Sequence, residues 1–190
     1  MTFHDGKACY IDCKKNIIIC DLGTGTDDHP DLHQPVVNEL GRPHPVRGVH
    51  LVACNSDLLL VVLHSRDSGH PVWAEVYKPE WTSTETCYPG VLLRERVMDL
   101  GDYSLFLGAR GHTFALSVKE FPAIKRNSIY YTSKSYYDNW CWISVFHLES
   151  NILEEIRYPE PEELKQDEAT NWRPYAWFCP RARASFHKQQ

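Results

Sequence analysis

The densest group of residues that could hold a metal ion comprises three carboxylates and two imidazoles: Asp27, Asp28, His29, Asp31 and His33. His29 and His33 are four residues apart, which would place both on one face of a helix, as in a zinc motif. Pro30 and Pro35 instead indicate a turn-rich loop, and no Glu lies between the two histidines as in H-E-x-x-H. Without a fixed geometry, these side chains make a poor zinc site. We therefore expect a solvated loop that binds no metal.

A serine, an acid and an imidazole also stand together, in the run Asp67-Ser68-Gly69-His70. Catalytic triads bring such groups together from distant parts of the chain, whereas adjacent residues of a turn cannot orient one another in that way. Gly23-Thr24-Gly25 resembles the start of a dinucleotide-binding loop, but Asp28 stands where the third glycine belongs and no helical pattern follows. We expect no catalytic residue, no cofactor and no enzymatic activity.

The aromatic residues have more functional potential. Tyr136, Tyr137 and Trp140 lie in a predicted loop with Ser135 and Asp138, and exposed Tyr and Trp side chains are frequent anchors of protein interfaces. We take these three as the candidate partner-binding residues. The alternative interpretation is that they fill space between sheets. That interpretation is favoured for four tryptophans: Trp73, Trp142, Trp172 and Trp177.

The composition is that of a folded protein that does not bind nucleic acid. The chain has 190 residues, 43% of them hydrophobic, and a net charge of −5 with scattered Lys and Arg. It contains no apolar run of about 18 residues, so we expect no membrane association. Its 7 cysteines include no C-x-x-C pair. This pattern favours a reducing compartment, the cytoplasm or the nucleus.

Short strands dominate the rest of the sequence. Lys7–Asp12 and Asn16–Leu22 read as a hairpin, and the Pro-, Gly- and Asp-rich segment from Gly23 to Arg47 reads as a long connection. A second set contains four strands: Val49–Cys54, Asp57–Leu63, Val72–Lys78 and Leu92–Asp99. The third set also contains four: Tyr103–Leu107, Thr113–Leu116, Ser128–Thr132 and Trp142–Leu148. Charges in the middle of Leu92–Asp99 are typical of a solvated edge strand.

The remaining segments connect or end these sets. Ser117 and Glu120 have capping-box spacing, and Pro122 follows them, so we expect a single helical turn there. Glu149–Thr170 carries eight acidic residues and two basic ones, which predicts a solvated connector. Trp172–Phe178 reads as a last strand, and residues 181–190 as a flexible tail.

Strand sets that repeat at about 45 residues, with no long amphipathic helix between them, favour a propeller over a sandwich or a parallel α/β fold. We predict an all-β chain that forms a partial, open β-propeller. It would have two complete four-stranded antiparallel blades, Val49–Asp99 and Asp99–Leu148, flanked by partial blades.

A family resemblance agrees with this prediction. The residues that carry it follow one another in order and spacing along the chain: His4-Asp5-Gly6-Lys7, Tyr10, Asn16–Leu22, Leu58–Val62, Val76-Tyr77-Lys78, Leu100–Gly108, Ser117, Phe121-Pro122, Ile129–Thr132 and Trp177–Pro180. From Thr2 to Pro180 the chain resembles the plant F-box-associated β-propeller domain of KIB type, long classed as a domain of unknown function. The resemblance implies a propeller domain over residues 1–180. In fuller members an F-box docks on a Skp-Cullin ubiquitin ligase while the propeller holds the target protein.

The functional expectation is a non-enzymatic protein-binding module that resembles the substrate-binding propeller of plant F-box proteins. The strand pattern already begins at Phe3, so we expect no F-box in this chain and no binding of a Skp-type ligase subunit. One alternative is a truncated or degenerate paralogue without a specific partner. The least favoured alternative is a hydrolase built on a propeller scaffold.

Overall fold

The computed structural model describes residues 1–12, 17–21, 31–35, 46–65, 71–82, 90–108, 112–134 and 141–158. Within these ranges the regular structure consists of strands alone: β1 (Thr2–His4), β2 (Lys7–Ile11), β3 (Ile17–Asp21), β4 (Asp31–Pro35), β5 (Val46–Cys54), β6 (Asp57–Ser65), β7 (Pro71–Thr82), β8 (Gly90–Arg96), β9 (Tyr103–Leu107), β10 (Thr113–Ser117), β11 (Ser128–Lys134), β12 (Cys141–His147) and β13 (Ile152–Tyr158). The predicted all-β class is therefore confirmed.

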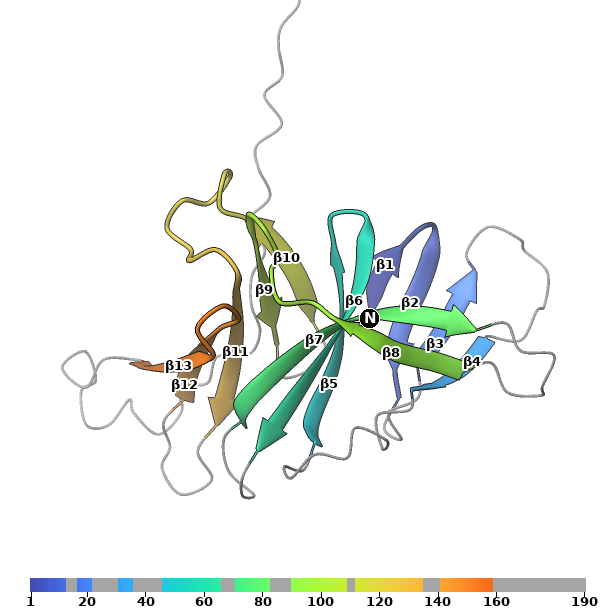
Figure 1. Cartoon of the computed structure of the whole chain (residues 1–190), viewed down its shortest axis with the longest axis horizontal. Helices are drawn as coiled ribbons and strands as arrows, with labels where there is room; N and C mark the ends of the chain where they lie inside the picture. Colours follow the sequence, from blue (N-terminus) through green and yellow to red (C-terminus); the bar gives the residue numbers. More distant parts are fainter. Residues whose placement is uncertain are drawn as a thin grey trace, which may run out of the picture.

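The strands form two sheets. One has eight strands in the order β1-β2-β3-β4-β8-β7-β6-β5, and the other has five in the order β10-β9-β11-β12-β13. The eight-stranded sheet is strongly curved: β1 and β2, at one end of the strand order, contact β5 at the other end without pairing with it. Figure 1 shows the result: strands β5–β7 lie in the middle, with β1–β4 on one side and β9–β13 on the other.

Strands β5 to β8 form the predicted four-stranded antiparallel blade, each strand paired with the next along the chain. Asn55 and Ser56 make the predicted turn between β5 and β6, and Asn55 takes a positive φ of 56°, a conformation that Asn tolerates well. The apolar run of β6 is buried from Leu58 to Ser65, as expected for a central strand covered on both faces.

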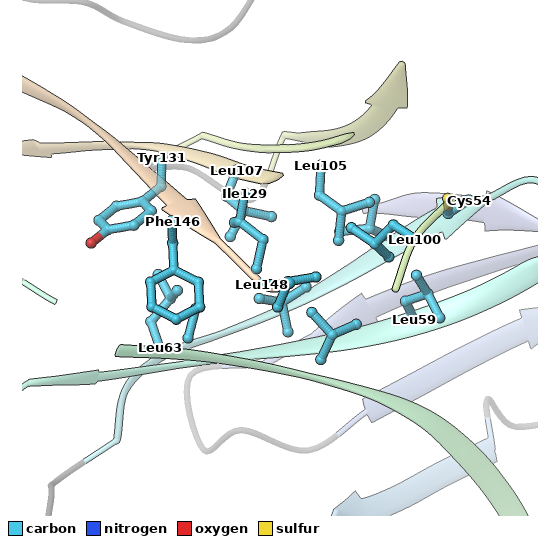
Figure 2. Packing of buried hydrophobic residues seen from close by; sticks show 14 residues of the cluster. Cys54, Leu59, Leu63, Leu100, Leu105, Leu107, Ile129, Tyr131, Phe146 and Leu148 are labelled. Atoms are coloured by element: carbon cyan, nitrogen blue, oxygen red, sulfur yellow. The ribbon is translucent and has the colours of Figure 1, made fainter. Parts of the chain in front are cut away.

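The two faces of this blade belong to two hydrophobic clusters. On one face, Leu59, Val61 and Leu63 of β6 pack with residues of the five-stranded sheet. Figure 2 shows Leu63 below Phe146, with Leu105, Leu107 and Ile129 beside them. On the other face, Leu58, Leu60 and Val62 pack with Cys9 and Ile17 of the N-terminal strands. Alternating residues of β6 thus pack against the five-stranded sheet on one face and against the N-terminal strands of the same eight-stranded sheet on the other.

The third strand set differs from the prediction of a four-stranded antiparallel blade. Strand β11 pairs in parallel with β9, and β13 adds a fifth strand beyond β12. Parallel pairing requires a crossover, which residues 118–127 supply by passing from β10 to the far side of β9. The predicted helical turn lies in this crossover, since the amides of Glu120 and Phe121 both donate to the Ser117 carbonyl, at 3.1 and 3.0 Å.

Three further predictions were wrong in part. The predicted connection Gly23–Arg47 contains β4, which pairs with β3 and β8 through its backbone and so needs no apolar pattern. For the same reason β8 lies inside the sheet, where we expected an edge strand. The predicted connector Glu149–Thr170 contains β13. Its sequence, Ile-Leu-Glu-Glu-Ile-Arg-Tyr, does not alternate strictly between apolar and polar residues, so it gave no clear strand signal.

Candidate functional site

The sequence-predicted interface residues Tyr136, Tyr137 and Trp140 lie outside the described residues. They belong to the connection between Lys134 and Cys141, which are paired with each other in the β11–β12 ladder. Two segments that could have carried chemistry, 23–25 and 67–70, are also outside the described residues, as are positions 27–29 of the Asp/His group.

The other members of the Asp/His group lie in β4, where Asp31 pairs with Ile19 and His33 pairs with Ile17. Over the part of the chain that the structure describes, there is no group of three or more His, Cys, Asp or Glu side chains that could hold a metal ion. The described thiols of Cys9, Cys20 and Cys54 are free. In the same residues, no helix is long and apolar enough to cross a membrane.

A buried polar cluster lies on one face of the central blade. Glu75 of β7 is fully buried, and its Oε2 atom lies 3.1 Å from His64 Nε2 and accepts a hydrogen bond of 3.1 Å from the Tyr77 hydroxyl. Arg96 Nη1 lies 3.5 Å from the other carboxylate oxygen. The Arg96 guanidinium also lies 5.8 Å from the centre of the Trp73 ring, within reach of a cation–π interaction.

This cluster joins three strands but is closed to a substrate, because Glu75 is 0% and His64 2% exposed. Because its groups come from β6, β7 and β8, we interpret it as a structural cluster that fixes how these three strands lie against one another. Trp73 is half-buried and contacts His64 and Arg96 of the same sheet; that it fills space between sheets stays a prediction. In the sequence, Trp73, Glu75 and Tyr77 alternate with small apolar residues and so share one face of the strand. This pattern was the sequence signal for the cluster.

A second cluster brings together Ser128, His147 and Glu154, and it invites comparison with a hydrolase triad. The Ser128 hydroxyl lies 2.9 Å from His147 Nδ1, and His147 Nε2 lies 3.4 Å from Glu154 Oε2. Ser128, however, is fully buried, and its hydroxyl donates a hydrogen bond of 2.9 Å to the Arg126 carbonyl. A nucleophile must be reachable and must give its proton to the base, so this geometry does not support acyl transfer at Ser128.

Lys125 completes this second cluster through an ion pair with Glu154. The hydrogen bond from the Lys125 ammonium, with a smaller contribution from His147, lowers the pKa of the Glu154 carboxyl. The same hydrogen bond raises the pKa of Lys125. Glu154 is therefore held as a carboxylate on the surface of the five-stranded sheet.

The five-stranded sheet turns an aromatic stripe away from the central blade. Phe106 of β9 stacks on Phe114 of β10, with ring centres 5.2 Å apart, and on Tyr130 of β11, with ring centres 4.6 Å apart. The ladders continue this line to Val145 of β12 and then to Glu154 of β13. We call the side of the sheet that carries these residues the outer face, because their sequence neighbours Leu105, Leu107, Ile129 and Phe146 point into the core.

Strand β13 forms one margin of the outer face, and two of its side chains are exposed to solvent. Ile152 is 58% and Ile156 40% exposed, two of the five large hydrophobic residues that are exposed in the described ranges. Both lie on the outer face, on either side of Glu154 in the alternation of the strand. Ile156 is opposite Ile143, toward the end of the sheet from which the connection with Tyr136, Tyr137 and Trp140 leaves.

A family model described as the KIB1-4 beta-propeller matches residues 1–160 of the chain. Together with an all-β structure whose sheets do not close on themselves in the described ranges, this match confirms the partial, open β-propeller predicted from the sequence. The predicted domain limit at residue 180 and the tail 181–190 lie beyond the match and stay predictions. No curated protein and no solved structure matches the chain.

Proposed function

Because the chain belongs to the KIB1-4 β-propeller family, we propose that it is a protein-binding module without enzymatic activity of its own. One observation carries the proposal. The outer face of the five-stranded sheet presents Ile152 and Ile156 of β13 to solvent, whereas Val145 of β12 and Phe106 of the aromatic stripe are buried. Exposed large apolar side chains that share one face of a sheet are a feature of protein interfaces.

The connection between β11 and β12 extends this surface in our proposal. Tyr136, Tyr137 and Trp140 follow Lys134 and precede Cys141, the two residues that end this ladder. Loops anchored at both ends on a rigid sheet commonly carry binding residues. We propose that these three aromatic side chains contact the same partner as Ile152 and Ile156.

The finer proposal concerns the kind of partner. The resemblance to F-box-associated domains supports a target protein held as substrate-binding propellers of F-box proteins hold theirs, in the cytoplasm or the nucleus. The chain would hold this target without binding a Skp-type subunit directly. A hydrolase is not favoured, because the Ser128 hydroxyl, which lies beside His147, is buried and donates a hydrogen bond to a backbone carbonyl.

Affinity capture with the immobilised full chain tests the protein-binding function. We expect a stoichiometric protein partner from extracts of the source organism. Its capture is lost in the double variant Ile152→Ser, Ile156→Ser and in the triple variant Tyr136→Ser, Tyr137→Ser, Trp140→Ser. Met98→Ser is the matched control, because Met98 is 46% exposed but lies between β8 and β9. If no variant-sensitive partner is captured, the alternative of a paralogue without a specific partner is correct.

A further inference from the structure

Strand β13 is the last strand of the five-stranded sheet. Among the described residues, β12 pairs with one edge of β13 and no strand pairs with its other edge. Its seven residues pair with β12 from His147↔Ile152 to Cys141↔Tyr158 without a shift of register. In an antiparallel ladder, about half of the N–H and C=O groups of an edge strand point away from its neighbour. β13 therefore presents a regular row of backbone donors and acceptors at the margin seen in Figure 1.

This edge lacks several of the devices that prevent strand addition. Natural edges are protected by charged side chains, above all lysine, by proline, and by bulges that twist the edge away. β13 contains no lysine or proline and no bulge, whereas each ladder of the central blade has a register shift. Its outer face exposes Ile152 and Ile156 on either side of Glu154, whose carboxylate is paired with Lys125.

The carboxylates of the edge are those of Glu154, which is paired with Lys125, and Glu155, which is exposed on the opposite face from the two isoleucines. Arg157 is the one basic residue of the strand. In the sequence, the segment from Glu149 to Thr170 carries eight acidic residues and two basic ones. A negative potential repels acidic partners and attracts basic ones, and it acts most strongly at low ionic strength.

We propose that the β13 edge binds an extended segment of a partner protein as an added strand, with aliphatic and basic residues alternating along that segment. Its aliphatic side chains would lie beside Ile152 and Ile156 on the outer face, and its basic side chains would lie near Glu155 on the other face. Main-chain hydrogen bonds supply affinity in such strand addition, while alternate side chains supply specificity. This inference rests on the proposed protein-binding function and specifies its partner.

A synthetic nonapeptide of alternating valine and lysine, labelled with fluorescein, is the probe, and fluorescence anisotropy with the full chain is the measurement. We expect saturable binding that weakens with added salt. A peptide of alternating valine and glutamate is expected not to bind. A valine–lysine peptide with N-methylated backbone amides is also expected not to bind, because it keeps the charge but cannot form the ladder.

Two variants test whether the peptide binds at β13. Glu155→Lys and Ile156→Ser are each expected to raise the dissociation constant by about ten-fold. Glu95→Lys, a matched change at an exposed residue near the end of β8, is expected to leave the dissociation constant unchanged. Glu155 and Ile156 are both exposed, so these variants are expected to fold, and their circular dichroism checks this. Equal binding of the N-methylated peptide, or equal binding by all variants, overturns the proposal.

The result also separates this inference from the proposed function. If the immobilised chain captures a partner that Glu155→Lys still retains, and the valine–lysine peptide does not bind, strand addition is wrong and protein binding stands. If no partner is captured by any form of the chain, the proposed function itself is wrong.

Discussion

The side chain of Asn127 joins the first residues of β11 to the segment between β8 and β9, because its Oδ1 atom accepts a hydrogen bond of 2.9 Å from the Leu100 amide. Its Nδ2 atom donates to the Met98 carbonyl at 3.4 Å. Asn127 is 6% exposed and takes a positive φ of 52°. Asn127 thus ties the segment that connects β8 to β9 to the start of β11, in addition to the hydrophobic packing between the two sheets.

Asn127→Ala is expected to lower the free energy of unfolding by about 2–4 kcal/mol, since it leaves the buried Leu100 amide without its acceptor and puts a less tolerant residue at positive φ. Asn127→Gly removes the same hydrogen bond, but glycine adopts a positive φ without strain, so this variant is expected to lower the free energy of unfolding by less than Asn127→Ala does. Urea unfolding measures both. Equal midpoints for the wild type and Asn127→Ala would show that this link does not hold the sheets together.

Glu75→Ala is expected to lower the free energy of unfolding by about 3–5 kcal/mol, because it leaves Arg96 without its buried carboxylate partner. Tyr77→Phe removes one hydrogen bond to Glu75 and is expected to cost about 1 kcal/mol. The measurement is again urea unfolding, with Lys78→Ala as a control for an exposed ion pair in the same strand. A loss for Glu75→Ala no larger than that of the control contradicts a structural role for this cluster.

Leu105→Ala and Ile129→Ala are each expected to lower the free energy of unfolding by about 2–5 kcal/mol, because both side chains are fully buried between the two sheets. Ile156→Ala, in the same sheet but exposed, is expected to change stability by less than about 1 kcal/mol. Thermal unfolding distinguishes the two classes. If Ile156→Ala destabilises the isolated chain as strongly as Leu105→Ala, the outer face is part of the core and not a binding surface.

Stability is expected to depend on pH through His50 of β5. Burial lowers the pKa of His50 from 6.5 to about 4. Between these two values the unfolded chain binds a proton that the folded chain does not, so the free energy of unfolding falls as the pH drops from about 6.5 to about 4. In His50→Gln this dependence is expected to be weaker. An identical pH profile for the variant would show that other groups cause it.

The sequence predicted the strands of the central blade well, because their burial on two faces produces continuous apolar runs such as Leu58–Leu63 and their turns use residues such as Asn55. It failed where pairing depends on the backbone alone. β4 is held by its neighbours, and β13 by its ladder with β12, so neither needs an apolar run. The crossover that makes β11 parallel to β9 leaves no periodic signal either.

The candidate site was only partly predictable for the same reason. Tyr136, Tyr137 and Trp140 were identified by residue type and lie outside the described residues. Ile152 and Ile156 fell in a segment interpreted as a solvated connector. Their exposure and their common face become visible only when β13 is paired with β12. The run Ile152–Tyr158 has no strict apolar–polar alternation, so the sequence carried no clear signal that would have located them.

Hydrogen-exchange mass spectrometry of the full chain, alone and with the partner it captures, tests most directly whether the chain binds proteins through the β13 side of the outer face. We expect the amides of Ile152–Tyr158 to gain protection in the complex, because an added strand bonds the outward-facing amides of β13. Strands β1–β3, on the other side of the central blade, are expected to exchange as in the free chain. Unchanged exchange in Ile152–Tyr158, or protection gained at β1–β3 instead, would contradict this account.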